Sequence, residues 1–360
     1  MRDIIYIFII VFLIIMILCT CIYNKENFNN SSNVNSLNKN SIFVPLYDDK
    51  GRKLNVTLIS KPLFKDSDFK QLLVNKPGRI YLGITSYMEF PSTPSNPRDK
   101  YKDYKEIQDS KKKNFNPNYY DMYLDICEGW LHCFREPKRY IKTNKPIVLI
   151  SESDFINYKK IRPDKNIKKK YDYIYSCPKV NSTSGCNDWV SYNKNWELAK
   201  RCIKIMSDMG LKGLLVGRKG CSVPKNCDTT GWVQYDKMIK LYQQARFLFL
   251  PNVADASPRV LTECLSLDIP CLINKDILGG WKYVNNKTGV FFTNEKDVEE
   301  NVNILIKNLN NYTPRQYIID NYGPVNSGKR LSKFLLDNFS DRLNYKNLNY
   351  VTIRNPVKNF

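Results

Sequence analysis

Short apolar runs and amphipathic stretches alternate along most of this chain. In the first half, residues 78–87, 119–129 and 145–155 have the apolar composition of strands, and residues 134–143 have the spacing of a helix. Residues 41–60 predict two strands joined by an Asp-Lys-Gly turn. Strands that alternate with helices indicate an α/β protein with a parallel sheet.

A lysine-rich stretch near residues 159–170 interrupts this pattern, and a second alternating series follows it. Strands are predicted at 171–177, 213–220, 246–252 and 270–275, and helices at 195–210, 235–245 and 257–268. Two such series predict two Rossmann-like domains, because each series can form its own sheet with helices on its faces. The predicted boundaries are residues 42–165, residues 166–345 and a tail at 346–360.

The N-terminal residues differ from the rest of the chain. Residues 4–23 form an uncharged apolar run long enough to cross a bilayer core at about 1.5 Å per helical residue. We expect residues 1–23 to be an uncleaved, single-pass membrane anchor, with a cleaved signal peptide as the alternative. The Asn- and Ser-rich residues 24–41 predict a disordered stem, because they hold too few apolar side chains to form a core.

The formal net charge of +21 favours an anionic partner, which can be a nucleic acid, a membrane surface or a phosphate-bearing substrate. The lysines are scattered, and no signature of a nucleic-acid-binding fold accompanies them. No nucleic-acid partner is therefore expected. A membrane-tethered nucleic-acid-binding protein stays an alternative that rests on charge alone.

Eleven cysteines and one histidine limit the metal and disulfide chemistry of the chain. No C-x-x-C pair is present, so a zinc site is not expected. Cys221 and Cys227 bracket a short segment, as do Cys177 and Cys186, and either pair is a candidate disulfide. Buried thiols are expected in the apolar runs that contain Cys202, Cys264 and Cys271.

The candidate chemistry gathers where predicted strands end. Asp255 follows one strand, and Ser257 with Pro258 is typical of the first turn of a helix. Glu263 lies about two turns inside that helix. The N-terminus of a helix attracts phosphate, and a carboxylate beyond it can accept both hydroxyls of a ribose. This spacing predicts a nucleoside diphosphate as the ligand.

Further motifs accompany the acidic pair in a fixed order. They are Gly231, a helix with Leu241, Tyr242 and Ala245, the strand end Pro251-Asn252, the pair Asp255 and Glu263, and a strand ending in Gly-Gly at 270–280. Together, residues 171–294 resemble the nucleotide-binding domain of retaining glycosyltransferases of the GT-B fold, the group 1 or family 4-like enzymes with an E-x7-E signature. The resemblance implies an N-terminal acceptor domain and a C-terminal nucleotide-sugar-binding domain.

The resemblance also implies roles for the matching residues. Glu263 would hold the ribose hydroxyls, and Thr262 with its neighbours would offer backbone amides to the diphosphate. Asp255 would contact the donor sugar or stabilise charge at its anomeric carbon, unless it only caps the helix. The glycines implied near the donor are Gly83, Gly217 and Gly231.

Two basic residues, Arg218 and Lys219, follow a predicted strand. They would neutralise the charge on a departing diphosphate without a metal, and a basic turn without a ligand is the alternative. The family carries its Arg and Lys pair earlier, where this chain has no Arg, so Lys179 or Lys194 is the expected substitute.

In the first half, His132 stands on a loop after a predicted strand. The resemblance implies that it faces the donor sugar, and packing beside Trp130 and Phe134 is the alternative. Glu152 and Asp154 end another strand, where they would bind acceptor hydroxyls or cap the next segment.

The function that this resemblance implies is transfer of a hexose or pentose from a nucleotide sugar to a glycan, lipid or protein acceptor, with retention of configuration. No metal and no cofactor other than the donor are expected, and residues 4–23 predict a location at the membrane. The alternative is a nucleotide-sugar-binding or scaffold protein whose catalytic half has decayed, because an Asp replaces the first Glu and the expected Arg is missing.

Overall fold

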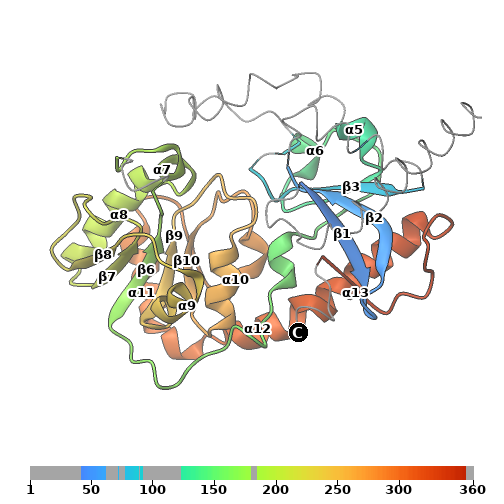
Figure 1. Ribbon diagram of the computed structural model, residues 1–360. Helices are drawn as coiled ribbons and strands as arrows, with labels where there is room; N and C mark the ends of the chain where they lie inside the picture. The colour runs from blue at the N-terminus through green and yellow to red at the C-terminus, as the bar shows by residue number, and fades with distance from the viewer. Residues whose placement is uncertain are drawn as a thin grey trace, which may run out of the picture. The chain divides into compact units, whose positions relative to one another are not determined.

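The computed structural model describes residues 42–61, 72, 78–88, 90–91, 123–179 and 185–353. These residues form two six-stranded sheets (Figure 1). The first has the strand order β12-β1-β2-β3-β4-β5, and the second has the order β11-β10-β9-β6-β7-β8. The α/β class and the two sheets that the alternating pattern predicts are therefore observed.

The first sheet mixes antiparallel and parallel pairs. Its strands are β1 (Phe43–Asp48), β2 (Lys53–Ile59), β3 (Ile80–Ile84), β4 (Gly129–Leu131), β5 (Ile147–Val148) and β12 (Val351–Thr352). The hairpin of β1 and β2 is closed by Asp48, whose carboxylate accepts hydrogen bonds from the backbone N–H groups of Lys50 and Arg52. From β2 to β5 all neighbours are parallel, so the carboxyl ends of these strands lie at one edge of the sheet.

Short helices connect the strands of the first sheet. They are α5 (Tyr123–Ile126), α6 (Pro137–Tyr140) and the 3-10 helix η3 (Glu152–Phe155). The prediction of a strand over residues 119–129 is wrong over most of its described part, 123–129, because α5 occupies residues 123–126 and strand β4 begins only at Gly129. Tyr123 and Cys127 are both fully buried, and their spacing of one helical turn places both side chains in one core.

The second sheet is parallel throughout. Its strands are β6 (Tyr171–Ser176), β7 (Gly213–Val216), β8 (Cys227–Thr230), β9 (Ala245–Leu250), β10 (Cys271–Asn274) and β11 (Gly289–Phe292). The chain reverses its direction of strand addition between β6 and β9, which are neighbours in the sheet. In sheets of this kind ligands bind beyond the carboxyl ends of the strands, next to such a reversal.

Helices cover both faces of the second sheet. They are α7 (Trp189–Asn193), α8 (Trp196–Asp208), α9 (Tyr235–Gln243), α10 (Arg259–Ser266), α11 (Val298–Lys307) and α12 (Pro314–Asn321), with the 3-10 helices η4 (Trp281–Tyr283) and η5 (Leu309–Asn311). One core contains side chains of α10 and α12, and the other contains side chains of α8 and α11. Strand side chains alternate between the two cores, as Ile174 and Tyr175 do in β6.

The helix α13 (Gly323–Phe339) returns the chain to the first sheet. Its residues Leu331, Phe334 and Leu335 lie in one core with strands β1, β2 and β3. Strand β12 then pairs with β1. Figure 1 shows this long helix beside the first sheet, and side chains from residues 323–352 therefore complete its core. The domain boundaries at 165 and 345 stay a prediction.

Cysteine pairing differs from both predicted alternatives. Cys186 and Cys221 form a disulfide, whereas Cys177 and Cys227 are buried thiols. The pairing could not be deduced from spacing, because it joins segments that the parallel strands β6 and β7 bring together. Cys202, Cys264 and Cys271 are buried thiols, as predicted.

Within the described ranges, no helix has the length and apolar composition that crossing a membrane requires. The predicted anchor at residues 4–23 and the predicted stem lie outside the described residues, so both stay predictions.

Candidate active site

The loop between β9 and α10 carries the predicted acidic site. Asp255 lies in this loop, and its carboxylate forms an ion pair with the Nζ of Lys194 at 2.6 Å. The side-chain amide of Asn252 donates to the same carboxylate oxygen at 2.9 Å. Side-chain exposure is 26% for Lys194 and 13% for Asp255, so this pair is only partly shielded from water.

Lys194 ends the short helix α7, and its position is fixed from several sides. Its carbonyl accepts a hydrogen bond from the hydroxyl of Tyr175 at 2.9 Å. The next residue, Asn195, donates its side-chain amide to the carbonyl of Pro251 at 3.0 Å. The end of α7 is thus joined to the loop that carries Asp255.

The helix α10 begins differently from the prediction. Pro258 is its N-cap residue, and Ser257, the predicted cap, makes no cap hydrogen bond. The Ser257 hydroxyl instead lies 2.8 Å from that of Ser153, in the segment that follows β5. No side chain therefore caps the first turn of α10, which directly follows the loop of Asp255.

Glu263 and Thr262 lie inside α10. Glu263 is 7% exposed, and its carboxylate accepts a hydrogen bond from the hydroxyl of Tyr235 at 3.1 Å. Tyr235 begins α9 and is itself 54% exposed. Thr262 is fully buried, and its hydroxyl donates to the carbonyl of Arg259 at 3.2 Å. Thr262 can therefore reach a ligand only through its backbone.

The Gly-Gly turn after β10 packs against the acidic loop. The N–H of Gly279 donates to the carbonyl of Asp255 at 2.9 Å, and a side chain at Gly279 would collide with the carbonyl of Ala256. Gly280 has a φ of +89°, and a Cβ there would lie 2.6 Å from Pro258. Both glycines are needed for this close approach, which fixes the backbone of Asp255.

Two other predicted glycines lie at the carboxyl ends of β7 and β8. Gly217 has a φ of +86°, and a Cβ there would lie 2.5 Å from the Cα of Pro178. Gly231 is half-buried, with open space where a side chain would be. Lys219 is exposed in the turn after β7, and its N–H donates to the carbonyl of Thr230.

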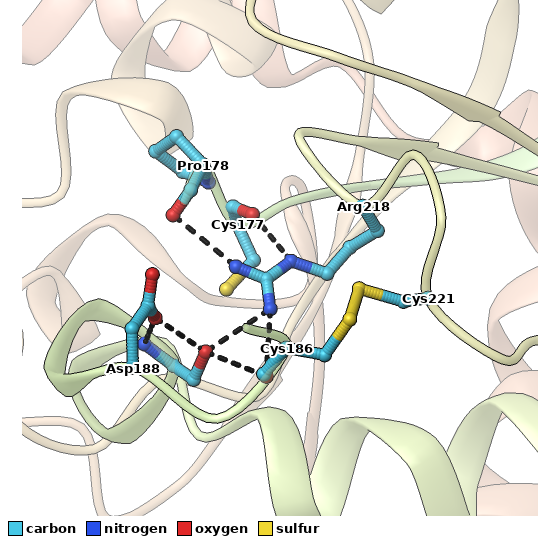
Figure 2. The surroundings of a disulfide bond; sticks show 7 residues. Cys177, Pro178, Cys186, Asp188, Arg218 and Cys221 are labelled. Carbon is cyan, nitrogen blue, oxygen red and sulfur yellow. Dashed lines mark hydrogen bonds between the residues drawn. A yellow bond between two sulfur atoms is a disulfide. The ribbon is translucent and has the colours of Figure 1, made fainter. Parts of the chain in front are cut away.

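The position of Arg218 does not agree with its predicted role. The residue is fully buried, and its guanidinium donates to the carbonyls of Cys177, Pro178 and Cys186 and to the hydroxyl of Ser191 (Figure 2). Its plane also lies over Trp196, 5.2 Å from the ring centroid. A guanidinium with these protein partners cannot reach a departing diphosphate, so the prediction for Arg218 is corrected to a structural one.

His132 is buried after β4, as the packing alternative expected, with its ring stacked near Phe134. Burial and the positive charge of Lys282 lower the pKa of His132 to about 4, so its imidazole is neutral at pH 7. Its Nδ1 has no hydrogen-bond partner among the described residues. A contact between His132 and a donor sugar stays a prediction.

Gly83 does not lie in a glycine-rich loop. It is inside strand β3, and a side chain there would occupy the space of the Trp130 ring. The glycine therefore admits a large core side chain, and its predicted place near a diphosphate is corrected.

Asp154 belongs to a buried network that sequence reasoning did not assign. It caps η3 together with Ser151, as one alternative expected, but it also pairs with Lys282 at 2.8 Å and accepts a hydrogen bond from Tyr283. Arg330 of α13 lies 3.9 Å from the same carboxylate. The network joins the segment after β5 to η4 and α13.

Across the residues that the structure describes, no group of three or more His, Cys, Asp and Glu side chains is arranged to hold a metal ion. Independence from metals stays a prediction.

Comparisons with known proteins bear on the second sheet and on the fold. The family model of glycosyl transferases group 1 matches residues 218–322, which include the acidic loop, α10 and the Gly-Gly turn. No curated protein matches the chain.

Several solved structures resemble this fold over 76–79% of the chain. Sucrose-phosphate synthase from Thermosynechococcus elongatus aligns with a TM-score of 0.55 and 9% identity, over 79% of this chain and 74% of that one. A mutant of S. aureus TarM, in complex with Fondaparinux, alpha-GlcNAc-glycerol and UDP, aligns at 0.52 and 13% identity over 76% of this chain and 53% of that one. Anabaena Alr3699/HepE in complex with UDP aligns at 0.52 and 9% identity, over 77% and 78%.

At these identities the structural likeness shows the fold alone, which is the two-sheet GT-B fold of glycosyltransferases. The family match adds a group 1 glycosyltransferase domain at residues 218–322. The predicted class, a glycosyltransferase that moves a sugar from a nucleotide-sugar donor to an acceptor, is therefore confirmed.

Proposed function

We propose that this glycosyltransferase uses a uridine diphosphate sugar, retains the configuration of the transferred sugar, and binds its donor between the Lys194–Asp255 pair and Glu263. The observation that carries the proposal is the ion pair itself. It places a cation and a carboxylate before the uncapped N-terminus of α10, where an anion is favoured.

Lys194 takes the place of the buried Arg218 in this proposal. The sugar–phosphate bond breaks during transfer, and negative charge grows on the departing diphosphate. A lysine close to the departing diphosphate stabilises the transition state more than it stabilises the bound donor, so it raises turnover. Lys219 is exposed at the adjacent carboxyl end of β7 and can add a second positive charge. In this proposal Lys194 substitutes for the missing Arg, which was one of the two arguments for a decayed enzyme.

The two carboxylates have separate roles in the proposal. Glu263 accepts the ribose hydroxyls, and Tyr235 orients it through the hydrogen bond to its Oε1. Asp255 occupies the first position of the E-x7-E signature, held by Asn252 and Lys194, and it stabilises positive charge at the anomeric carbon on the retained face. The uridine base is supported by the UDP that the TarM and HepE structures contain.

The acceptor is proposed to be a glycan, lipid or protein hydroxyl at a membrane, on the grounds of the apolar segment at residues 4–23. In transfer, this hydroxyl forms the new bond to the anomeric carbon, and its proton passes to the leaving diphosphate.

The proposal is tested by incubating the full-length protein with a panel of nucleotide sugars and measuring release of the nucleoside diphosphate. Uridine donors are expected to give the fastest release. Glu263→Gln is expected to weaken UDP binding about tenfold to a hundredfold, because hydrogen bonds to a charged group contribute roughly 1.5–3 kcal/mol.

Glu197→Gln is the matched control, since Glu197 is an exposed glutamate on α8 whose carboxylate pairs with Lys200. It should leave UDP affinity unchanged. Binding of UDP without release of UDP from any donor would instead favour the nucleotide-sugar-binding or scaffold protein, and equal UDP affinity of Glu263→Gln and wild type would refute the ribose site.

A further inference from the structure

A disulfide closes the segment that leads to Lys194. Cys186 lies before α7 and Cys221 lies in the turn after β7, and the bond between them joins positions 35 residues apart (Figure 2). Both cysteine residues are half-buried, so neither is fully shielded from water. The disulfide therefore links the two segments at a position that solvent partly reaches.

Arg218 stands beside this disulfide and holds the same two segments. From the turn after β7, it donates to the carbonyl of Cys186 at 3.0 Å and to the hydroxyl of Ser191 at 3.0 Å. The Ser191 hydroxyl and N–H in turn donate to Asp188, the N-cap of α7, at 2.6 and 2.8 Å. Figure 2 shows the guanidinium directed into this loop. The start of α7 is thus fixed by one covalent link and one buried cation.

The other end of α7 is the site. The helix spans Trp189–Asn193 and is followed directly by Lys194, whose Nζ pairs with Asp255. A helix of this length does not form on its own, because too few hydrogen bonds offset the ordering of its backbone. Its position, and with it the position of the Lys194 backbone, depends on the contacts at its two ends.

We propose that Cys186–Cys221 and Arg218 form a redox-sensitive clamp that positions Lys194 for the donor diphosphate. Arg218 is a positioning residue in this clamp and does not touch the donor. The inference rests on the function proposed above for Lys194. It adds that the affinity for a diphosphate depends on the oxidation state of one cysteine pair.

The chemistry of the switch is a thiol–disulfide exchange with a dithiol. The dithiol gives two electrons and two protons, the Cys186–Cys221 bond breaks, and two thiols form while the dithiol becomes a disulfide. Reduction removes the covalent constraint on the loop and leaves Arg218 as the only link between the two segments among the contacts described above. We expect α7 to become more mobile and Lys194 to leave Asp255 more often.

The direct test measures the reactivity of Lys194 without any donor. Full-length protein, oxidised or treated with dithiothreitol, is labelled briefly with an amine-reactive ester, and the modified peptides are quantified by mass spectrometry. Lys194 should react several-fold faster after reduction. Lys333, an exposed lysine that pairs with Asp337 on α13, should be unchanged.

The Cys186→Ser/Cys221→Ser double variant controls for other effects of the reductant. Its Lys194 should react at the fast rate with and without dithiothreitol. Equal labelling of Lys194 in the oxidised and reduced wild-type protein would overturn the clamp, whatever the enzyme binds.

The functional test compares UDP with uridine, which lacks the diphosphate. Reduction should weaken UDP binding at least about tenfold and leave uridine binding unchanged, and Arg218→Lys should do the same, since a lysine cannot supply the planar set of donors. In Lys194→Met, reduction should have no further effect on UDP.

The outcomes separate the two proposals. UDP bound equally well before and after reduction removes the clamp and leaves the proposed function intact. No UDP binding in either state, together with faster labelling of Lys194 after reduction, keeps the clamp and removes the proposed donor site. Equal loss of UDP and uridine binding overturns the specific effect on Lys194, because it would show general loss of structure.

Discussion

Two lysine–aspartate pairs in this molecule use the same groups at nearly the same distance. Lys194 and Asp255 lie 2.6 Å apart, and their side chains are 26% and 13% exposed. Lys282 and Asp154 lie 2.8 Å apart, and theirs are 6% and 0% exposed. The first pair follows a helix of five residues and faces a loop, whereas the second is enclosed by Tyr283, Ser151 and α13.

The difference lies in what replaces water around the charges. The carboxylate of Asp154 has protein donors on both oxygens, and burial together with this carboxylate raises the pKa of Tyr283. Such a carboxylate is satisfied by protein donors and holds segments together. The pair at Asp255 keeps partial contact with solvent, so a bound phosphate can replace water there. Exposure therefore separates the structural pair from the candidate functional pair.

The largest expected effect on stability comes from breaking the enclosed pair. Asp154→Ala should lower the free energy of unfolding by about 3–5 kcal/mol, because it leaves the ammonium of Lys282 buried without a carboxylate. Denaturant unfolding of the full-length protein measures this loss. Asp208→Ala, which removes the exposed partner of Lys204, should cost about 0–1 kcal/mol. Similar losses of unfolding free energy in the two variants would contradict the distinction between the buried pair and an exposed pair.

Breaking the Lys194–Asp255 pair should have the opposite result, with a large loss of activity and a small loss of stability. Lys194→Met should reduce turnover on the order of a hundredfold, by analogy with loss of one charge-stabilising donor, while unfolding changes by about 1 kcal/mol or less. Steady-state kinetics and unfolding of the same preparation check this. Lys200→Met, which removes a half-buried lysine of α8 that pairs with Glu197, is the control. A stability loss as large as that of Asp154→Ala would make Lys194 structural too.

The enclosed region should also respond to pH through His132, the one histidine of the chain. Its pKa is lowered to about 4 in the folded protein, against about 6.5 in an unfolded chain. The unfolded state therefore binds the proton first as the pH falls, and stability is lost between about pH 6.5 and pH 4. His132→Gln should show a shallower loss over this window. Parallel unfolding curves for the two proteins would show that His132 is not held neutral.

The smallest expected effect concerns Tyr235, which supports Glu263 at the open site. Tyr235→Phe removes one hydrogen bond to the carboxylate and should weaken UDP binding by a few-fold, at about 1 kcal/mol. Calorimetric titration with UDP measures the change. Tyr171→Phe, at the start of β6, removes a tyrosine–carboxylate hydrogen bond to Asp228; it is the control and should leave UDP binding unchanged. A loss as large as that of Glu263→Gln would mean that Tyr235 itself binds the donor.

The second sheet was predictable because its local and long-range signals agree. Strands such as Tyr171–Ser176 and Ala245–Leu250 are short apolar runs, and buried parallel strands have this composition. Two strands were not predicted, β8 and β11, and both lie at the edges of the sheet. β8 has the sequence CDTT, which is too polar to be recognised, and it is a strand because it pairs with β7. β11 has the sequence GVFF and pairs only with β10. Hydrophobic patterns therefore predict buried strands well and predict edge strands poorly.

The candidate site was predictable in its residue types and less so in its contacts. Asp255 and Lys194 were each considered, but their pairing depends on β6 and β9 lying side by side, which no local pattern states. Arg218 was misjudged because an arginine at a strand end looks available, whereas its exposure depends on the carbonyls of a distant loop. The sequence did not indicate a role for Lys282, because its partner Asp154 lies far away in the sequence, in the segment after β5.

The pairing of β12 with β1 has a consequence for biosynthesis. Tyr47 lies opposite Thr352, so an edge of the first sheet stays open until residue 352 has left the ribosome. At about 5–20 residues per second, the hairpin of β1 and β2 waits on the order of tens of seconds for its partner strand and for the helix that covers it. The second sheet draws its strands from one continuous stretch and can close while synthesis continues. The first sheet is therefore the first to be synthesised and the last to be completed.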